Sequence, residues 1–341
     1  MKVLVTGGCG FIGSNFIKLI LNGHENVEIV NFDKLTYAGN IKNLDQLKNN
    51  VNYSFVKGDI SSEEDLVNII SKKNFDFIVN FAAESHVDRS IADPSDFLKT
   101  NIMGTYTLLN LSNKFLKKNQ NFKFIHISTD EVYGALKIDD QPFSEESQLA
   151  PNSPYSASKA SSDHLVRAWH HTYGLNTIIT NCSNNYGPFQ HREKLIPLTI
   201  INAIQGKEIT IYGDGSNIRD WLYVDDHCKA ILKVMNDGKI GETYNIGGSN
   251  EISNLEVVKK ICSILQNKLP PSDNEKIKAR IEKYEELITF VNDRPGHDFR
   301  YAINQTKIEK DLSWYPIEDF DSGIEKTIDW YILNLDQITS D

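Results

Sequence analysis

Close to the N-terminus the sequence reads Lys2-Val3-Leu4-Val5-Thr6-Gly7-Gly8-Cys9-Gly10-Phe11-Ile12-Gly13, an apolar run followed by a glycine-rich turn. The run predicts a buried strand, and the apolar spacing over Ser14–Asn22 predicts a helix directly after the turn. The glycines satisfy G-x-G-x-x-G from Gly8 and G-x-x-G-x-x-G from Gly7. A turn without side chains lets the backbone approach a pyrophosphate, and it aims the N-terminus of the helix at that anion. The stretch therefore predicts a parallel α/β sheet that binds a dinucleotide.

The second predicted strand, Val27–Asp33, ends on an acidic residue 20 positions after Gly13. A carboxylate at that position accepts hydrogen bonds from the adenosine ribose and repels a 2′-phosphate. We therefore expect NAD rather than NADP, although the adjacent Lys34 weakens this preference slightly. After a third predicted strand, Tyr53–Lys57, the residues Gly58-Asp59-Ile60 are placed to meet the adenine.

The same alternation of strands and helices continues through the first half of the chain. Strands are expected over Asp76–Ala82 and over the residues that lead to Thr129, and helices over Ser62–Lys73, Pro94–Lys118 and Pro154–Tyr173. Such alternation implies right-handed crossovers and a doubly wound parallel sheet.

From about Gly187, short strand-like pieces separated by helices follow, namely Thr210–Gly213, Trp221–Asp226 and Thr243–Gly247. We expect residues 1–186 to form the nucleotide-binding domain. Residues 187–341 are expected to form mainly a smaller C-terminal substrate-binding lobe, with some segments returning to the large sheet. The region from about Leu269 to Ala279 carries no motif, so the sequence predicts no role for it.

The composition narrows the classes of function. With 341 residues, of which 40% are hydrophobic and 24% charged, the chain is that of a globular protein with a sizeable core. A net charge of −10 argues against a general nucleic-acid or membrane-surface binder. The longest apolar run, around Leu195–Ile204, is broken by Pro197 and is too short to span a bilayer. We therefore expect a cytoplasmic protein with no nucleic-acid or membrane partner.

Neither a CxxC pair nor metal-ligand spacing occurs among the four cysteines, which are Cys9, Cys182, Cys228 and Cys262. Reduced, mostly buried thiols are therefore expected. His86, with Glu84 and Asp88 nearby, raises the alternative of a metal site, but no second ligand cluster supports it. We expect no metal, and a hydrogen-bonding role for His86 beside a substrate.

A second informative stretch runs from Phe124 to Gly134 and contains Ser128-Thr129-Asp130-Glu131. An apolar strand changes there into a hydroxyl pair and two adjacent carboxylates. Ligands of an open parallel sheet bind beyond the carboxyl ends of the strands, so polar residues at this position face the ligand. An isolated Asp-Glu pair is more often a solvated loop, but the neighbouring motifs favour a functional pair.

Ser153 and Pro154 predict the start of a helix, as its N-cap and its first residue. On that helix Tyr155 and Lys159 lie one turn apart on the same face. A free tyrosine has a pKa of about 10, and we expect the nearby ammonium to lower the pKa of Tyr155. The phenolate would then serve as a base toward a sugar hydroxyl. Tyr-x-x-x-Lys is common by chance, but after a nucleotide-binding turn and a Ser-Thr strand end it indicates a catalytic pair.

On these motifs the chain resembles the extended short-chain dehydrogenase/reductase family, and within it the nucleotide-sugar 4,6-dehydratases. The resemblance covers nearly the full length, and no motif position departs from it. The glycine-rich turn and Tyr-x-x-x-Lys mark the superfamily, whereas Asp130-Glu131 after Thr129 narrows it to dehydratases. Further matching stretches are Phe32–Asn40, Ala82–Ser90, Asn181–Pro188, Arg219–His227 and Asp293–Asp298. The resemblance implies a Rossmann-type fold, tightly bound NAD, and a lyase that acts on dTDP-glucose.

The resemblance also implies a role for each residue of the two motifs. Tyr155, with Lys159, takes the proton of the C4 hydroxyl of glucose while NAD accepts a hydride, and Thr129 hydrogen-bonds the reacting oxygen. Glu131 then removes the C5 hydrogen as a base, and Asp130 protonates the departing C6 hydroxyl as an acid. Hydride returns to C6, which regenerates the cofactor and gives a 4-keto-6-deoxy sugar. One carboxylate must be ionised and the other protonated, a division that burial and adjacent charge favour.

By the same resemblance, further residues contact the two small molecules. NAD is expected to contact Gly7, Gly10, Phe11, Ile12, Gly13, Asp33, Lys34, Leu35, Thr36, Asp59, Ile60, Ala82, Thr100, Tyr155, Lys159 and Asn185. The nucleotide-sugar is expected to contact Ser85, His86, Thr129, Asn184, Lys194, Leu195, Tyr212, Arg219, Asn254, Asp293, Arg294 and His297. Arg219 has an independent rationale, because a guanidinium can clamp a diphosphate with two hydrogen bonds. The alternative for Arg219 is a surface ion pair with Asp220.

The family also implies a homodimer in which the helices Pro94–Lys118 and Pro154–Tyr173 form a four-helix interface. Their apolar residues could equally belong to an intramolecular core. The residues alone choose neither thymine over uracil nor the pathway that consumes the product, such as rhamnose biosynthesis.

Two other functions remain open. A nucleotide-sugar 4-epimerase would use Tyr155, Lys159 and NAD, but it needs no acid/base pair at C5 and C6, so Asp130 and Glu131 argue against it. A non-catalytic NAD-sensing scaffold protein need not keep Thr129, Tyr155 and Lys159 intact.

Overall fold

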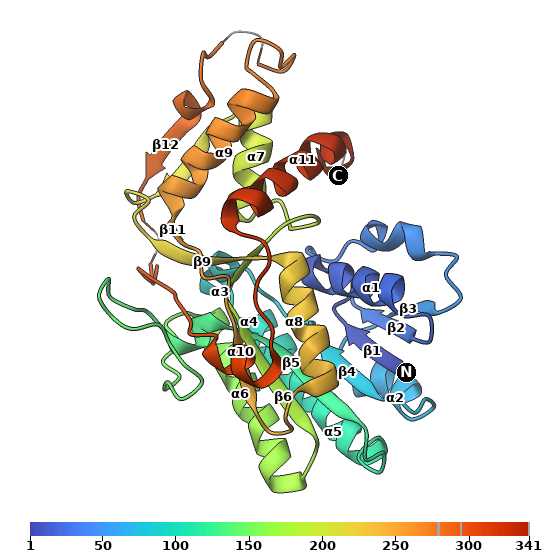
Figure 1. Ribbon diagram of the computed structural model, residues 1–341. Helices are drawn as coiled ribbons and strands as arrows, with labels where there is room; N and C mark the ends of the chain where they lie inside the picture. Colours follow the sequence, from blue (N-terminus) through green and yellow to red (C-terminus); the bar gives the residue numbers. More distant parts are fainter. Residues whose placement is uncertain (278–279, 294, 340–341) are drawn as a thin grey trace.

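A computed structural model describes residues 1–277, 280–293 and 295–339 (Figure 1). Within these residues, seven strands form a main sheet in the order β10-β6-β5-β4-β1-β2-β3. Every neighbouring pair in this sheet runs parallel, which confirms the predicted Rossmann-type doubly wound fold. The strands are β1 (Lys2–Thr6), β2 (Glu28–Asp33), β3 (Tyr53–Lys57), β4 (Phe77–Asn80), β5 (Lys123–Thr129), β6 (Thr177–Cys182) and β10 (Thr243–Ile246).

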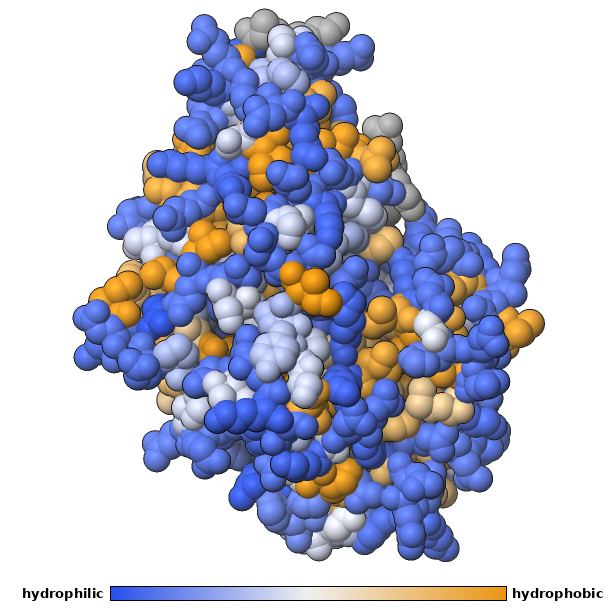
Figure 2. Space-filling view, in the orientation of Figure 1, coloured by the Kyte–Doolittle hydropathy of each residue, from blue (hydrophilic) through white to orange (hydrophobic). Residues whose placement is uncertain are grey.

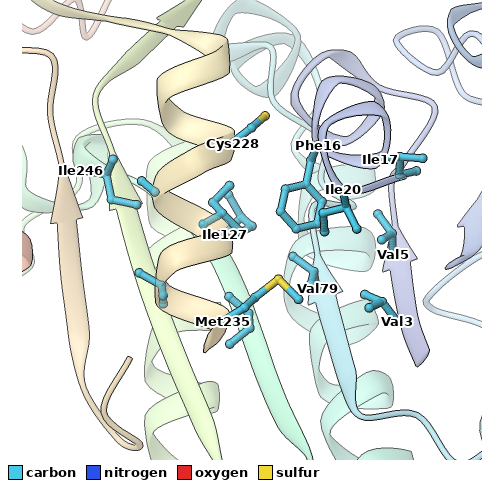
Figure 3. Close-up of a cluster of buried hydrophobic side chains, with 14 of the residues drawn as sticks. Val3, Val5, Phe16, Ile17, Ile20, Val79, Ile127, Cys228, Met235 and Ile246 are labelled. Carbon is cyan, nitrogen blue, oxygen red and sulfur yellow. The ribbon is translucent and has the colours of Figure 1, made fainter. Parts of the chain in front are cut away.

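Helices cover both faces of this sheet. One face carries α1 (Phe11–Gly23), α8 (Val224–Asp237) and α10 (Thr306–Leu312), and the other carries α2 (Glu63–Ile70), α5 (Thr105–Phe115) and α6 (Pro154–Tyr173). Side chains alternate between the faces as they must in a strand, so Val3 and Val5 join one core and Leu4 the other. Figure 3 shows the first core, where Phe16 of α1 and Met235 of α8 lie over the sheet.

Helix α6 matches its prediction from end to end. The Ser153 side chain accepts a hydrogen bond from the Ser156 amide and completes a capping box, while Pro154 takes the first helical position. Gly174 ends the helix in the left-handed conformation, with φ of 65°. The predicted Tyr155–Lys159 pair is therefore carried by a helix whose two ends are set by local sequence.

The single helix expected over 94–118 is wrong in its interior. A short helix α3 (Val87–Ala92) precedes α4 (Ser95–Phe97), a π-helical segment η2 (Leu98–Gly104) and α5. The wider π turn presents Asn101, whose side chain accepts from the Glu84 amide at 2.9 Å and donates to the Ser158 hydroxyl at 2.8 Å. Such insertions often occur at functional sites, and here one ties the loop after β4 to α6.

The C-terminal part packs above the carboxyl ends of the strands (Figure 1). In its described residues, β7 (Asn184–Tyr186), β9 (Ile218–Tyr223) and β11 (Glu251–Ser253) form one small sheet, and β8 (Ile209–Tyr212) pairs with β12 (Ile288–Val291). These strands share a separate hydrophobic core with α7 (Leu195–Gln205), α9 (Asn254–Lys268) and α11 (Phe320–Thr339). The strand expected over 221–226 ends at Tyr223, because Val224 begins α8. Short 3-10 helices are η1 (Ile41–Leu47), η3 (Asp130–Tyr133) and η4 (Tyr284–Leu287).

The surface and the thiols add few constraints. The face in Figure 2 is mostly hydrophilic, with hydrophobic side chains in small groups. In the part of the chain that the structure describes, we find no helix with the length and apolar character needed to cross a membrane. Cys9, Cys182, Cys228 and Cys262 are unpaired and buried.

Candidate active site

The carboxyl ends of β1, β4, β5 and β6 meet at one edge of the sheet, because these strands are parallel neighbours. Thr129, the last residue of β5, lies in register with Cys182 at the end of β6. Thr6 at the end of β1 lies in register with Asn80 at the end of β4. The two motifs of the sequence therefore reach the same edge from strands that are far apart in the chain.

The glycine-rich turn leaves no room for side chains. A Cβ added to Gly7 would lie 2.6 Å from the Ala82 amide nitrogen, and one added to Gly13 would lie 2.5 Å from the Gly7 carbonyl oxygen. Gly7 also has a φ of +71°, which favours glycine. Gly10 is the N-cap of α1, and no side chain of the described residues caps this helix. The helix N-terminus therefore faces the turn with its amides available to an anion, which fits the pyrophosphate of a dinucleotide.

Asp33 ties the end of β2 to this turn. One carboxylate oxygen accepts from the Cys9 amide at 2.8 Å, and the other accepts from the Leu35 amide at 2.7 Å. Burial raises the pKa of Asp33, while these two hydrogen bonds oppose the rise. Lys34, which we expected to weaken the preference for NAD, pairs with Asp59 at 2.9 Å. Because the Lys34 ammonium pairs with Asp59, it does not neutralise Asp33, which remains the acidic group at the turn.

The hydroxyl and carboxylate groups after β5 lie in 3-10 helix η3. The Thr129 hydroxyl accepts from the Glu131 amide at 3.3 Å and donates to Asp130 Oδ1 at 3.3 Å. Asp130 is 2% exposed, and its Oδ2 has no hydrogen-bond partner among the described residues. Burial, followed by the charge of Glu131, raises the pKa of Asp130 well above its usual range. Glu131 is only partly buried, so the two adjacent carboxylates occupy different environments.

Tyr155 and Lys159 project from α6 toward the same strand end. The Tyr155 hydroxyl lies near enough to Thr129 for that side chain to favour its ionised form, and the Lys159 ammonium donates to the Ile127 carbonyl at 2.7 Å. In the protein alone, burial and then Glu131 raise the pKa of Tyr155, the opposite of the direction we expected. The sequence showed that Lys159 is near but could not show how deeply Tyr155 is buried. The chain alone therefore does not make Tyr155 a phenolate at neutral pH.

The remaining residues expected to contact NAD border this edge from several elements. Phe11 and Ile12 open α1, Leu35 and Thr36 follow β2, and Asp59 and Ile60 follow β3. Ala82 follows β4, Thr100 lies in η2, and Asn185 lies in β7. The Asn185 side-chain oxygen contacts His227 Nδ1 at 2.8 Å, so a buried histidine of α8 orients it.

Residues expected to contact the sugar follow β4 and precede α7. The Lys194 ammonium donates to the Ser85 carbonyl at 3.0 Å, and Leu195 opens α7 directly after it. His86 lies 3.4 Å from the Glu193 carboxylate, which also pairs with Arg89 at 2.5 Å. The structure thus brings the loop after β4 against the segment before α7.

Residues expected to contact the nucleotide lie mostly in the C-terminal part. Tyr212 ends β8 and packs edge-on against His297, whose ring is 2.6 Å from the Asp293 carboxylate. Asn254 opens α9, and Asn184 opens β7. Arg294 lies outside the described residues.

Arg219 links the C-terminal residues to the carboxylates after β5. Arg219 is 6% exposed and Asp220 is 2% exposed, so the alternative of an ion pair on the surface does not describe them. The Arg219 guanidinium donates to the carbonyls of Ile218 at 2.7 Å and Asp298 at 3.0 Å, and its charge lowers the pKa of Asp130. The guanidinium that we expect to bind a diphosphate therefore also donates hydrogen bonds to backbone carbonyls.

Sequence reasoning missed Tyr301, which also belongs to this site. Tyr301 lies under the Arg219 guanidinium, 4.4 Å from it, and donates its hydroxyl hydrogen bond to Asp298. Burial raises the pKa of Tyr301, and the charge of Glu131 is the next cause, so this side chain lies within electrostatic range of Glu131. The only signal in the sequence is that Tyr301 follows the matching stretch Asp293–Asp298 by three residues.

No group of three or more histidine, cysteine or acidic side chains that could hold a metal ion occurs in the described residues. The nitrogen Nε2 of His86, which raised this alternative, faces Glu193 instead.

Comparison with known proteins agrees with this geometry. The model of the GDP-mannose 4,6 dehydratase family matches residues 4–327. A dTDP-glucose 4,6-dehydratase of Neisseria meningitidis serogroup B is 52% identical over 338 residues, 98% of this chain and 94% of that protein. The structure of the Bacillus anthracis dTDP-glucose 4,6-dehydratase in complex with NAD superposes with a TM-score of 0.85 at 47% identity, covering 98% and 97% of the two chains.

A more distant likeness is to the UDP-glucose 4-epimerase of Thermotoga maritima, at 27% identity and a TM-score of 0.84, with 98% and 100% of the chains covered. Identity to the dehydratases is therefore much higher than to this epimerase. The expected resemblance to nucleotide-sugar 4,6-dehydratases is confirmed, and the chain belongs to the GDP-mannose 4,6 dehydratase family, in which its relatives include dTDP-glucose 4,6-dehydratases.

Proposed function

We propose that this protein is a dTDP-glucose 4,6-dehydratase that uses bound NAD to form dTDP-4-keto-6-deoxyglucose and water. The observation that carries the proposal is the arrangement after β5. Among the described residues, Asp130 is a buried carboxyl group with one oxygen that has no hydrogen-bond partner, and Glu131 is a partly exposed carboxylate. Both lie near Thr129 and Tyr155. Oxidation of a hydroxyl needs Tyr155 and Thr129, and elimination of water needs an acid and a base next to them.

NAD fits the residues of the nucleotide edge. Gly7, Gly10 and Gly13 leave space for the pyrophosphate at the N-terminus of α1. Asp33, which is held at this turn, would accept hydrogen bonds from the adenosine ribose. When bound, NAD would supply the nicotinamide ring that exchanges hydride with C4 and C6. The positive charge of the oxidised ring would lower the pKa of Tyr155 and so oppose the effect of burial.

The oxidation is assigned to the side chains around Tyr155. The Tyr155 oxygen takes the proton of the C4 hydroxyl, and the Thr129 hydroxyl donates a hydrogen bond to the same C4 oxygen. Lys159, 3% exposed, holds a positive charge on the same helix face. These groups are preorganised, because Thr129 is already bonded to its own turn and Lys159 to Ile127.

The elimination is assigned to the adjacent carboxylates. A C4 ketone acidifies the C5 hydrogen, which Glu131 removes as a base. Asp130 gives its proton to the C6 hydroxyl, which leaves as water. Burial and then the negative charge of Glu131 raise the pKa of Asp130, which favours the protonated form that an acid needs.

The two parts of the chain divide the work in this proposal. Residues 1–186 bind NAD and carry the reacting groups, and residues 187–341 bind mainly the nucleotide through Tyr212, Arg219, Asn254, Asp293 and His297. Helix α8 and strand β10 of the second part pack on or in the main sheet, so the division is one of function more than of packing.

We also propose that the protein is a homodimer that supplies deoxysugar synthesis, for example of rhamnose, in the cytoplasm. Exposed apolar side chains on η2, α5 and α6 support the dimer, among them Leu98, Met103, Tyr106 and Tyr173. The unpaired cysteines support a reducing compartment. Sedimentation at two protein concentrations tests the dimer, and Met103→Asp should convert a dimer to monomers.

One experiment tests the function. The purified protein is incubated with dTDP-glucose, and the products are identified by mass spectrometry and NMR. A 4-keto-6-deoxy product with loss of one water supports the dehydratase. Conversion to the C4 epimer without loss of water would indicate the 4-epimerase, and recovery of unchanged substrate would indicate a non-catalytic NAD-binding protein.

A further inference from the structure

Asp163 lies on α6 one turn after Lys159 and two turns after Tyr155, so the three residues share one face of the helix. We propose that Asp163 is a positioning residue, whose carboxylate is the counter-ion that keeps the buried Lys159 ammonium charged and in place beside Tyr155. The inference rests on the proposed function and adds to it a residue that acts through Lys159.

Two strands hold the Asp163 carboxylate in a fixed position. Its Oδ2 accepts from the Ser128 hydroxyl of β5 at 2.9 Å and from the Asn181 amide of β6 at 3.2 Å. The Asn181 amide also donates to the Thr129 carbonyl at 3.1 Å, one residue before Asp130. Asp163 is 5% exposed, so its location among these groups depends on packing rather than on solvent. The carboxylate is thus fastened directly behind the strand end that carries the catalytic groups.

His126 lies close to Asp163 but does not neutralise it. Its Nε2 is 3.4 Å from Asp163 Oδ1, and its Nδ1 is 3.2 Å from the side-chain nitrogen of Asn80. The Asn80 oxygen accepts from the Thr6 hydroxyl at 2.6 Å, which identifies the Asn80 nitrogen as the donor to Nδ1. The imidazole therefore carries its one proton on Nε2 and is neutral. Burial and the charge of Lys159 hold the pKa of His126 well below its usual range.

The charge that matches Asp163 is that of Lys159. The Lys159 ammonium donates to the Ile127 carbonyl, which offers a dipole but no charge. Burial lowers the pKa of Lys159 and Asp163 raises it, while burial raises the pKa of Asp163 to about 6 and Lys159 opposes that rise. Each charge therefore favours the charged form of the other. A lysine buried without a counter-ion releases its proton readily.

Neighbouring elements bring further titratable groups toward this pair. His126 of β5 is neutral, and burial raises the pKa of Tyr133 in η3 and of Cys182 in β6. Asp130 and Glu131 of η3 act on Tyr155. Within the described residues, Asp163 is the carboxylate that supports the charge of Lys159.

The first test compares pH profiles. Asp163→Asn keeps the size of the side chain but removes the charge, so the alkaline limb of kcat for 4-keto-6-deoxy product should move to lower pH by about 1 unit. Asp163→Glu should return the limb toward that of the unchanged protein. Asp226→Asn is the matched control, because Asp226 is a buried carboxylate of α8 that accepts from the Ile317 and Glu318 amides. The control should lower Tm and leave the limb in place, as a purely structural carboxylate would.

The second test needs neither turnover nor a substituted Asp163. In protein labelled with ¹³C-lysine, the Cε resonance of Lys159, identified by its loss in Lys159→Arg, is followed against pH. It should shift near pH 6 as Asp163 titrates, in line with the pKa of about 6 given above. The proposal is overturned by a Lys159 resonance without that inflection, or by a folded Asp163→Asn variant with an unmoved alkaline limb. Failure of the unchanged protein to form product would count against the proposed function instead, and the resonance would still test the pair.

Discussion

Asp130 and Glu131 are neighbours in the chain, yet only Asp130 is enclosed. Asp130 is 2% exposed and keeps one carboxylate oxygen without a partner among the described residues, whereas Glu131 is partly exposed. A 3-10 turn after β5 produces this difference, because it sends consecutive side chains in different directions. Two acidic residues that are adjacent in the sequence can therefore serve one as an acid and the other as a base, because their environments differ.

This enclosure predicts that Asp130→Asn makes the protein more stable and less active. The pKa of Asp130 is raised in the folded state, so between the unfolded and folded pKa values the unfolded chain binds fewer protons. Stability must then fall as pH rises through that range. Asn carries no charge to desolvate, so it should raise Tm at pH 8.5 by about 2 °C, and by less at pH 5.5. Thermal unfolding of both proteins at the two pH values measures this.

An equal change of Tm at both pH values would contradict the assignment of the effect to ionisation of Asp130. Glu145→Gln, at a partly buried acidic residue outside this pair, controls for general effects of removing a carboxylate.

Tyr155→Phe should abolish the first oxidation while leaving the binding site in shape. The hydroxyl is the proposed base, and loss of a general base costs about 10²- to 10⁴-fold in rate. The ring contact with Phe97 needs no hydroxyl, so the helix should keep its position. Product formation should fall by that factor, while calorimetric titration should show dTDP-glucose binding nearly as before. Turnover close to that of the unchanged protein would exclude Tyr155 from the mechanism.

Much of the site follows from local sequence. The glycine-rich turn, the Asp33 position and the capped helix carrying Tyr155 and Lys159 depend on residues within one turn or one strand end, so their patterns are readable. The edge at which they meet follows from the parallel order of the strands.

The rest depends on contacts between distant segments. Tyr301 contacts Arg219, which lies 82 positions earlier in the chain, and Asp163 contacts Ser128, which lies 35 positions earlier. No local sequence pattern predicts either contact. The π-helical η2 exists because Asn101 bonds to Glu84 and Ser158, which periodicity does not encode. The direction of the pKa shift of Tyr155 was wrong for the same reason, since burial is set by tertiary packing.

Asp33 should account for most of the preference for NAD. Its carboxylate is held by the Cys9 and Leu35 amides, so it cannot turn away from a 2′-phosphate. Asp33→Asn should therefore reduce the ratio of NAD affinity to NADP affinity by about tenfold. Dissociation constants of both cofactors for the cofactor-free protein measure the ratio. Lys34→Gln is the control and should not alter it, because Lys34 pairs with Asp59. Comparable binding of NAD and NADP by the unchanged protein would remove this role from Asp33.

Glu131→Gln tests the elimination apart from the oxidation. Gln keeps the size of the side chain but cannot take the C5 proton, while Tyr155 and Thr129 remain to oxidise C4. We expect reduced nicotinamide to accumulate on adding dTDP-glucose, with product formation lowered by about 10²- to 10⁴-fold. In deuterated solvent the unchanged protein should place one solvent-derived deuterium at C5, and this variant should place almost none.

Asp130→Asn is the matched partner in that experiment. It removes the acid that protonates the C6 hydroxyl, so water should leave slowly, but Glu131 can still remove the C5 hydrogen. Exchange of deuterium at C5 of the bound sugar should therefore persist in Asp130→Asn and disappear in Glu131→Gln, although both make little product. NMR of the recovered sugar distinguishes the two variants. If Glu131→Gln exchanged the C5 hydrogen and eliminated water as fast as the unchanged protein, the base would have to be sought elsewhere. Tyr301, whose pKa the charge of Glu131 raises, would then be the next side chain to substitute.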